Sequence, residues 1–307
     1  MSDCEEEQLN VGDIINNEFK ILSFINKGSF GSVYKAEKND NKIVAMKTES
    51  DNNKLLYKEY IKYKDIQHIK GIPNIYWYGN EYNKNILVMS CLGNNLGTLF
   101  KYCEKQFSLK TLCMISYQIV NILEQVHDIG YIHKDIKPDN ILIGYKSNRN
   151  RIYLVDFGLS NEFIVNHEHI PYTNNRHFAG TYRYSSIRNH VGSEQSRRDD
   201  LESYGYTIIY FFKGCLPWEN IKCKEKEKRI KIFNIKKKIS CEELCTNTNS
   251  IIYDYIKYTR LLRFKEKPDY EKIRNLFLSY FSENSNEKFD YMYDWIIKAQ
   301  KKNIINK

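Results

Sequence analysis

Short runs of alternating apolar and polar residues fill most of the N-terminal part of the chain. A repeat of two residues predicts β-strands, and turn signals at 26–28 and 39–41 predict that the first three strands are antiparallel neighbours. Segment 53–67 instead places its apolar residues at helical spacing. The predicted strands are residues 19–25, 32–36, 43–47, 76–78 and 86–89.

The pattern becomes helical after Gly93. Segment 109–127 is apolar on one face and segment 201–213 nearly all round, which predicts an amphipathic helix and a buried one. The polar stretch 160–198 has little periodicity, and so long an irregular segment inside a domain is usually functional. Shorter elements are expected as strands at 141–143 and 152–155 and as helices at 251–262, 269–280 and 289–298. We therefore predict an α+β fold, with a small β-rich lobe, a connector near 89–93 and a larger helical lobe.

Composition narrows the class of protein only modestly. The 307 residues are 42% hydrophobic and 14% aromatic, which excludes a disordered chain. The 47 Lys and Arg exceed the 38 Asp and Glu and give a net charge of +9. This excess suits phosphate-bearing ligands or acidic partners but selects neither.

The cysteines and the N-terminus indicate an intracellular location. None of the eight cysteines forms a C-x-x-C motif or a set at zinc-ligand spacing, so we interpret them as reduced thiols. The first residues are acidic rather than apolar and resemble no signal peptide. The longest apolar run, 206–212, is far shorter than the ~20 residues of a membrane helix. We expect a protein of the cytoplasm or nucleus with no membrane span.

Two features of the N-terminal lobe suggest phosphate binding. Gly28, Ser29 and Gly31 lie between two predicted strands, where glycines let backbone N–H groups approach a polyphosphate. Lys47 ends a strand and Glu59 lies on the following helix, and a lysine held by a carboxylate presents a fixed ammonium to phosphates. Ordinary hairpin glycines and solvated surface charges are the alternatives.

The strongest chemical signal is the loop 133–140. Asp135, Lys137 and Asn140 combine a carboxylate, an ammonium and an amide, which suit hydroxyl activation, charge neutralisation and metal ligation. A polar turn is the alternative, but it does not explain Asp156, which follows an apolar strand and precedes Phe157-Gly158. A charged carboxylate at the end of a buried strand costs free energy unless a cation, such as a metal ion, pairs with it.

With these motifs in this order, the sequence resembles the protein kinase superfamily. Within it, the chain resembles the casein kinase I family from about Phe19 to Trp295, although the usual Ala-Pro-Glu segment is missing. The segments that carry this resemblance are 29–31, 71–73, 87–89, 107–111, 169–172, 194–203, 216–218 and 267–270.

The resemblance implies the two-lobed kinase fold, with an N-lobe at 19–89, a hinge at 90–93 and a C-lobe at 94–300. An acidic extension at 1–18 and a short basic tail at 301–307 flank it.

The same resemblance implies ATP in the cleft between the lobes. Ala45 is expected beneath the adenine and Met89 behind it. Lys47 is expected to pair with Glu59 and not with Asp65, the competing acid near the end of the same predicted helix. The full set of expected nucleotide-binding residues is Gly28, Ser29, Gly31, Val33, Ala45, Lys47, Glu59, Met89 and Leu92.

For catalysis, the resemblance implies Asp135 as the base and Lys137, in the serine/threonine pattern, as the group that neutralises the transferred phosphoryl. Thr181 is expected to bridge these two residues, and Asn140 and Asp156 to hold Mg²⁺.

The resemblance also implies protein substrates whose Ser or Thr lies downstream of a phosphoserine or an acidic residue. Arg183 and Arg229 are the expected anion pocket, because guanidinium groups bind phosphate in a bidentate manner. For Arg229, the alternative is one more charge on a basic helix face. We expect a monomer.

Three residues depart from the family pattern without removing a reacting group: Asn26 for a loop glycine, Lys134 for an arginine and Arg188 for an asparagine. Lys134 is expected to anchor the activation segment more loosely. Since the sequence stops soon after Trp295, we expect constitutive activity without autoinhibition in cis.

Two other functions stay open. One is a pseudokinase or scaffold, which the intact reacting groups disfavour. The other is a nucleic-acid or microtubule-binding module that uses the basic tract 222–238, although a solvated helix face is the simpler interpretation of that tract.

Overall fold

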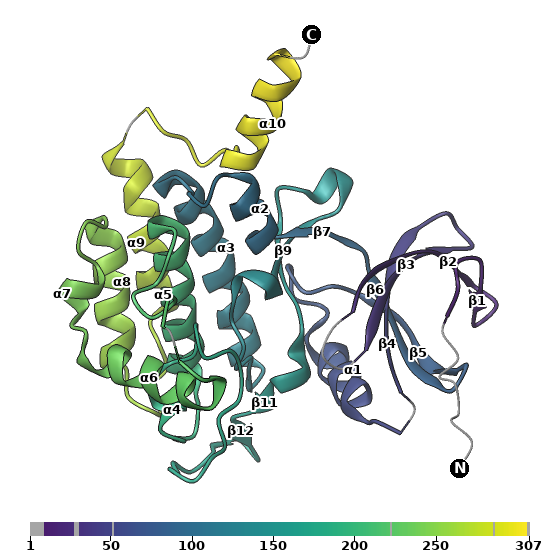
Figure 1. The fold of residues 1–307 in the computed structure, drawn as a ribbon, viewed down its shortest axis with the longest axis horizontal. Helices are drawn as coiled ribbons and strands as arrows, with labels where there is room; N and C mark the ends of the chain where they lie inside the picture. Colours follow the sequence, from purple (N-terminus) through teal and green to yellow (C-terminus); the bar gives the residue numbers. More distant parts are fainter. Residues whose placement is uncertain (1–8, 28–30, 51, 222, 285, 306–307) are drawn as a thin grey trace.

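A small β-rich lobe and a larger helical lobe lie side by side (Figure 1). This arrangement, in a computed structural model, confirms the predicted α+β, bilobal fold class. The structure describes residues 9–27, 31–50, 52–221, 223–284 and 286–305.

The N-terminal lobe is one antiparallel sheet with a single long helix, α1 (Leu55–Ile66), beside it. The strands follow the order β1-β2-β3-β4-β6-β5. Their bounds are β1 Ile14–Ile15, β2 Phe19–Lys27, β3 Ser32–Lys38, β4 Ile43–Ser50, β5 Ile75–Glu81 and β6 Lys84–Ser90.

The alternation in these strands separates a core face from the face that carries Lys47. Tyr34, Val44 and Met46 are buried in the core of this lobe, and Leu9 and Ile15, which precede the first predicted strand, join them. Because neighbouring residues of a strand project from opposite faces, Val33, Ala45 and Lys47 project from the other face.

A helical bundle forms the second lobe. The longest helix, α3, packs against α5 and α9, and α5 also packs against α8. The helices are α2 Leu96–Tyr102, α3 Leu109–Asp128, α4 Ile187–His190, α5 Arg197–Lys213, α6 Glu225–Lys238, α7 Cys241–Leu244, α8 Ser250–Leu261, α9 Tyr270–Glu283 and α10 Asp294–Ile305. None of the helices in the described residues is long and apolar enough to cross a membrane.

Among the described residues, three smaller sheets follow the N-terminal sheet, and the chemistry-bearing loops adjoin them. They consist of β7 Leu92–Asn95, β8 Tyr131–Ile132, β9 Ile141–Gly144, β10 Ile152–Leu154, β11 Asn161–Glu162, β12 Ile164–Val165 and β13 Glu168–His169. Short 3₁₀ turns adjoin them at η1 Pro138–Asn140, η2 Lys146–Asn148 and η3 Phe157–Leu159. In the antiparallel pair β9–β10, Ile141 lies opposite Leu154. Asn140, which precedes β9, and Asp156, which follows β10, therefore lie at the same end of this pair.

Two helices begin elsewhere than the apolar pattern predicts. Helix α5 begins at Arg197 rather than Leu201, because Ser196 and Asp199 form a capping box there and its polar first turns are buried. Helix α10 begins at Asp294 rather than at residue 289. Helix α2 was not predicted, since its seven residues are too few to establish a period.

Candidate active site

An ion-paired lysine links the two lobes. Nζ of Lys47 donates to Oε2 of Glu59 at 2.6 Å and to Oδ1 of Asp156 at 3.2 Å. Burial alone would lower the pKa of Lys47, but the two carboxylates outweigh it and raise that pKa, so the lysine is a fixed ammonium. The competing acid Asp65 instead accepts a hydrogen bond from the hydroxyl of Tyr131. The structure therefore pairs Lys47 with the predicted acid.

Asp156 occupies a backbone conformation that a non-glycine residue adopts only under constraint, with φ +68°. Its N–H donates to the hydroxyl of Tyr63 at 3.0 Å. The next side chain, Phe157, is fully buried between the rings of Tyr63 and His133. Burial raises the pKa of Asp156, but Lys47 and other nearby cations outweigh burial and lower it. The carboxylate is thus charged and held beside Lys47.

The loop after β8 gathers the predicted catalytic residues. Nζ of Lys137 donates to Oδ2 of Asp135 at 2.5 Å and to Oγ1 of Thr181 at 3.3 Å. The Thr181 hydroxyl donates to the other oxygen of Asp135 at 2.8 Å. Asn140 donates through Nδ2 to the backbone oxygen of Asp135 at 2.9 Å, which leaves its own Oδ1 as the atom for a cation. All four predicted residues therefore belong to one network.

Asp200, which the sequence analysis did not single out, anchors this loop from helix α5. Its carboxylate accepts the N–H groups of His133 at 2.7 Å and Lys134 at 2.8 Å. It also lies 3.0 Å from Nε2 of His127, whose other ring nitrogen lies 2.6 Å from the hydroxyl of Tyr270. Burial raises the pKa of Asp200, but the hydrogen bond and charge of His127 outweigh it, so the pKa is lowered. Its signal in the sequence is a pair of acids at the start of an apolar helix.

The strand register places four of the predicted nucleotide-binding residues on one face of the sheet. Val33 lies opposite Lys47, and Ala45 lies opposite Met89. Opposite residues of an antiparallel pair share a face, as do alternate residues along β4. Val33, Ala45, Lys47 and Met89 therefore share the face that presents Lys47 to α1.

Two further residues of the predicted nucleotide-binding set lie in the described part of the chain. A Cβ built on Gly31 would lie 1.6 Å from the backbone oxygen of Thr48, so only glycine fits this position. Leu92 begins β7, at the predicted hinge. Gly28 and Ser29 lie outside the described residues.

The two arginines of the predicted anion pocket each have a partner inside the protein. Nη1 of Arg183 lies 2.9 Å from Oε1 of Glu219, and Nη1 of Arg229 donates to the backbone oxygen of His190 at 3.3 Å. The Arg183 side chain is 44% exposed and the Glu219 side chain 12%, so a carboxylate already occupies one side of the guanidinium. No motif pointed to Glu219.

The basic tract is not simply a solvated helix face, because Lys236 is fully buried. Its Nζ donates to the backbone oxygens of Tyr182 at 2.9 Å and Ser185 at 2.6 Å and lies against the rings of Tyr206 and Trp218. The sequence pattern of the tract does not indicate this role of Lys236, because the segment that contains Tyr182 and Ser185 lies far away in the sequence.

Two residues that depart from the family pattern have acidic partners. Nζ of Lys134 lies 4.0 Å from Glu194, and Arg176 binds the other carboxylate oxygen of the same acid. Arg188 donates to Oε2 of the buried Glu202 at 3.1 Å. The Arg176–Glu194 and Arg188–Glu202 pairs connect segment 176–188 to helix α5 and to the residues just before it.

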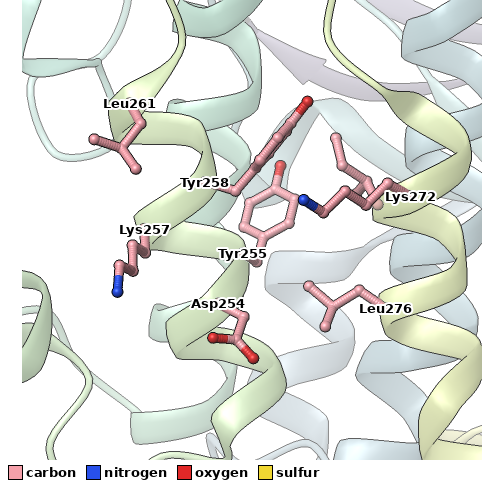
Figure 2. A pocket seen from close by; sticks show the side chains of 8 residues that line it. Asp254, Tyr255, Lys257, Tyr258, Leu261, Lys272 and Leu276 are labelled. Atoms are coloured by element: carbon pink, nitrogen blue, oxygen red, sulfur yellow. The ribbon is translucent and has the colours of Figure 1, made fainter.

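A hollow of about 410 Å³ between α8 and α9 lies apart from these groups. Figure 2 shows Tyr258 and Leu261 on one helix and Lys272 and Leu276 on the other. None of the predicted catalytic or nucleotide-binding residues lines it.

Two lobes joined through an ion-paired lysine, with an acid and an amide at the end of one small sheet, are the architecture of enzymes that transfer phosphoryl groups from ATP. The family model described as protein kinase domain matches residues 19–296, and the chain belongs to this family. Membership confirms the superfamily resemblance and implies a kinase activity with ATP as the phosphoryl donor and proteins as substrates.

Proposed function

We propose that the chain is a serine/threonine protein kinase of the casein kinase I type. It transfers the γ-phosphoryl group of Mg-ATP to Ser or Thr in acidic or phospho-primed protein substrates. The observation that carries this proposal is the position of Lys137, two residues after Asp135 and hydrogen-bonded to both Asp135 and Thr181. A lysine at this spacing is the serine/threonine pattern of the resemblance.

The residues at the end of the β9–β10 pair suit Mg²⁺, which takes oxygen ligands in proteins. Asp156 offers a charged carboxylate that is 44% exposed, and Asn140 offers an amide oxygen. Held there, the ion would supply positive charge against the negative charge that develops on the phosphates during transfer. We assign Asn140 and Asp156 to this ion.

Asp135 is the group that we assign to the substrate hydroxyl. The attacking oxygen forms the new bond to the γ-phosphorus while the bond to the oxygen bridging the β- and γ-phosphates breaks, and Asp135 receives the hydroxyl proton. Thr181 and Lys137 each hold one oxygen of this carboxylate, which orients it. Lys137 and Lys47 supply fixed positive charge for the transferred and remaining phosphates, so electrostatics and positioning lower the barrier.

We propose Arg183 and Arg229 as the contacts for an acidic or phosphorylated residue upstream of the target. The exposed side of Arg183 supports this role. Glu219 opposes it, because an incoming anion must compete with this carboxylate for the same guanidinium. We therefore expect Glu219 to weaken the preference for primed substrates.

We also propose that the enzyme is constitutively active. Glu194 provides Lys134 and Arg176 with a carboxylate from the chain itself, so this contact of the activation segment needs no added phosphate. The expected location is the cytoplasm or nucleus, and the expected state a monomer.

The alternatives have less support. A pseudokinase would not require the complete contacts of Lys47, Asp135 and Asp156. A binding module for nucleic acids or microtubules needs free cations along 222–238, but Lys236 is buried and Lys231 pairs with Glu227.

The test is phosphorylation of a peptide pair that differs only in an upstream phosphoserine, followed by identification of the modified amino acid. We expect phosphoserine or phosphothreonine and faster turnover of the primed peptide. Arg183→Ala should reduce this preference, and Glu219→Gln should raise it by up to about fivefold, the size of a partly exposed charge pair. Phosphotyrosine as the product, or equal effects of both substitutions on both peptides, contradicts the proposal.

A further inference from the structure

Lys62, on helix α1, holds the backbone that follows Asp156. Its Nζ donates to the carbonyl oxygen of Phe157 at 3.0 Å and to that of Gly158 at 3.1 Å. Lys62 follows Glu59 by three residues, so both side chains lie on the same helix face. One turn of α1 therefore contacts both the ion-paired lysine of the sheet and the loop of the other lobe.

The surroundings of Lys62 are not those of a solvated surface lysine. Burial lowers its pKa to about 8, with the charges of Lys134 and Lys58 acting in the same direction and those of Glu59 and Asp156 against it. A partly buried ammonium is retained only where hydrogen-bond acceptors compensate its lost hydration. Here the two carbonyl groups are those acceptors.

The same loop receives a second contact from the neighbouring residue of α1. The hydroxyl of Tyr63 accepts the N–H of Asp156 at 3.0 Å, and its ring packs on Phe157. Asp156 has a positive φ, a backbone conformation that costs free energy for a residue other than glycine unless neighbouring contacts hold it. The carbonyl of Phe157 also accepts the N–H of Ser160 at 3.1 Å, which closes the turn. Contacts on both sides of residue 157 thus hold Asp156 in its strained conformation.

We propose that Lys62 is a positioning residue for phosphoryl transfer. By binding the carbonyls of Phe157 and Gly158, it couples the position of α1 to the position of the Asp156 carboxylate. This inference rests on the proposed function, in which Asp156 holds the cation at the phosphates.

The experiment compares Lys62→Met with Lys62→Arg and with the control Lys58→Met, an exposed lysine one turn earlier on the same helix. Lys62→Met should lower kcat roughly tenfold, the effect of losing one charge-assisted hydrogen bond, and leave the peptide KM unchanged. Lys62→Arg should restore most of the loss, because a guanidinium can also donate to two carbonyls. Lys58→Met should match wild type.

Hydrogen exchange gives a readout that does not depend on activity. The amides of residues 156–160, including Ser160, should exchange faster in Lys62→Met than in Lys58→Met, while both variants remain folded at the assay temperature. If wild type phosphorylates nothing, the proposed function fails and exchange alone decides on the coupling. If wild type is active and Lys62→Met matches it in kcat or in exchange, the inference is overturned.

Discussion

The charged side chains of the site are held in position by ion pairs and hydrogen bonds, several of them to other elements. Lys47 lies between Glu59 and Asp156, and Lys137 lies between Asp135 and Thr181. When one partner is removed, the other is left as an unpaired charge in a partly buried position. The free-energy cost of that unpaired charge exceeds the stabilisation that the intact pair provides. Substitutions that preserve shape are therefore the informative ones at this scale.

Asp135→Asn should lower turnover by at least roughly a hundredfold, because the amide cannot accept the hydroxyl proton. ATP affinity should change little, since Asp135 is predicted to contact the substrate hydroxyl rather than the nucleotide. Calorimetric titration with ATP and a steady-state peptide assay separate the two quantities. Asp139→Asn, an exposed acid in the same loop, is the control and should behave as wild type. Turnover retained in Asp135→Asn would remove this residue from the role of base.

Elements could be predicted where their own side chains carry the pattern. The strands around Lys47 alternate clearly, and α3 has a continuous apolar face. The apolar pattern misses the start of α5, because the buried residues of its first turns include Arg198, Asp199 and Asp200, which also bind groups elsewhere in the chain. The spacing of Ser196 and Asp199 is the local signal of this helix start. A hydrophobic pattern does not report buried polar residues that are satisfied by distant groups.

The same limit applies to the site. Asp135, Lys137 and Asn140 are found from spacing because one loop carries them together. The contacts of Lys62 with Phe157 and of Lys236 with Ser185 join segments far apart in the sequence, so only the folded structure shows them.

Helix α6 supports the loop that follows Thr181. Lys236→Met should raise the peptide KM severalfold and leave the ATP KM unchanged, because the carbonyls of Tyr182 and Ser185 lose their donor. Each unsatisfied buried carbonyl costs about 1–3 kcal/mol, so the thermal midpoint should also fall. Lys238→Met, an exposed position on the same helix, is the control. An equal rise in both KM values would indicate general unfolding instead of a loop effect.

At the scale of the whole molecule, the contacts that complete the site join the two lobes directly. The pairs Lys47–Asp156 and Lys62–Phe157 each have one residue in either lobe, and Glu194 anchors Lys134 without a phosphate. The described residues thus connect the two lobes through groups that the chain itself supplies, as the proposed constitutive activity requires.

Phosphatase treatment should therefore leave the specific activity of the purified protein nearly unchanged. The measurement compares initial rates before and after treatment, with mock-treated protein as the control. A large rise would reveal an inhibitory phosphate and a large fall an activating one, and either would contradict constitutive activity.

The most direct test of the central claim is transfer of radiolabel from γ-labelled ATP to casein by wild type and by Asp156→Asn, with Mg²⁺ present. We predict label in casein with wild type and with the control Asp139→Asn, and background label with Asp156→Asn although this variant remains folded at the assay temperature. No transfer by folded wild type, or full transfer by Asp156→Asn, would contradict the assignment of Asp156 and the residues around it as the site of phosphoryl transfer.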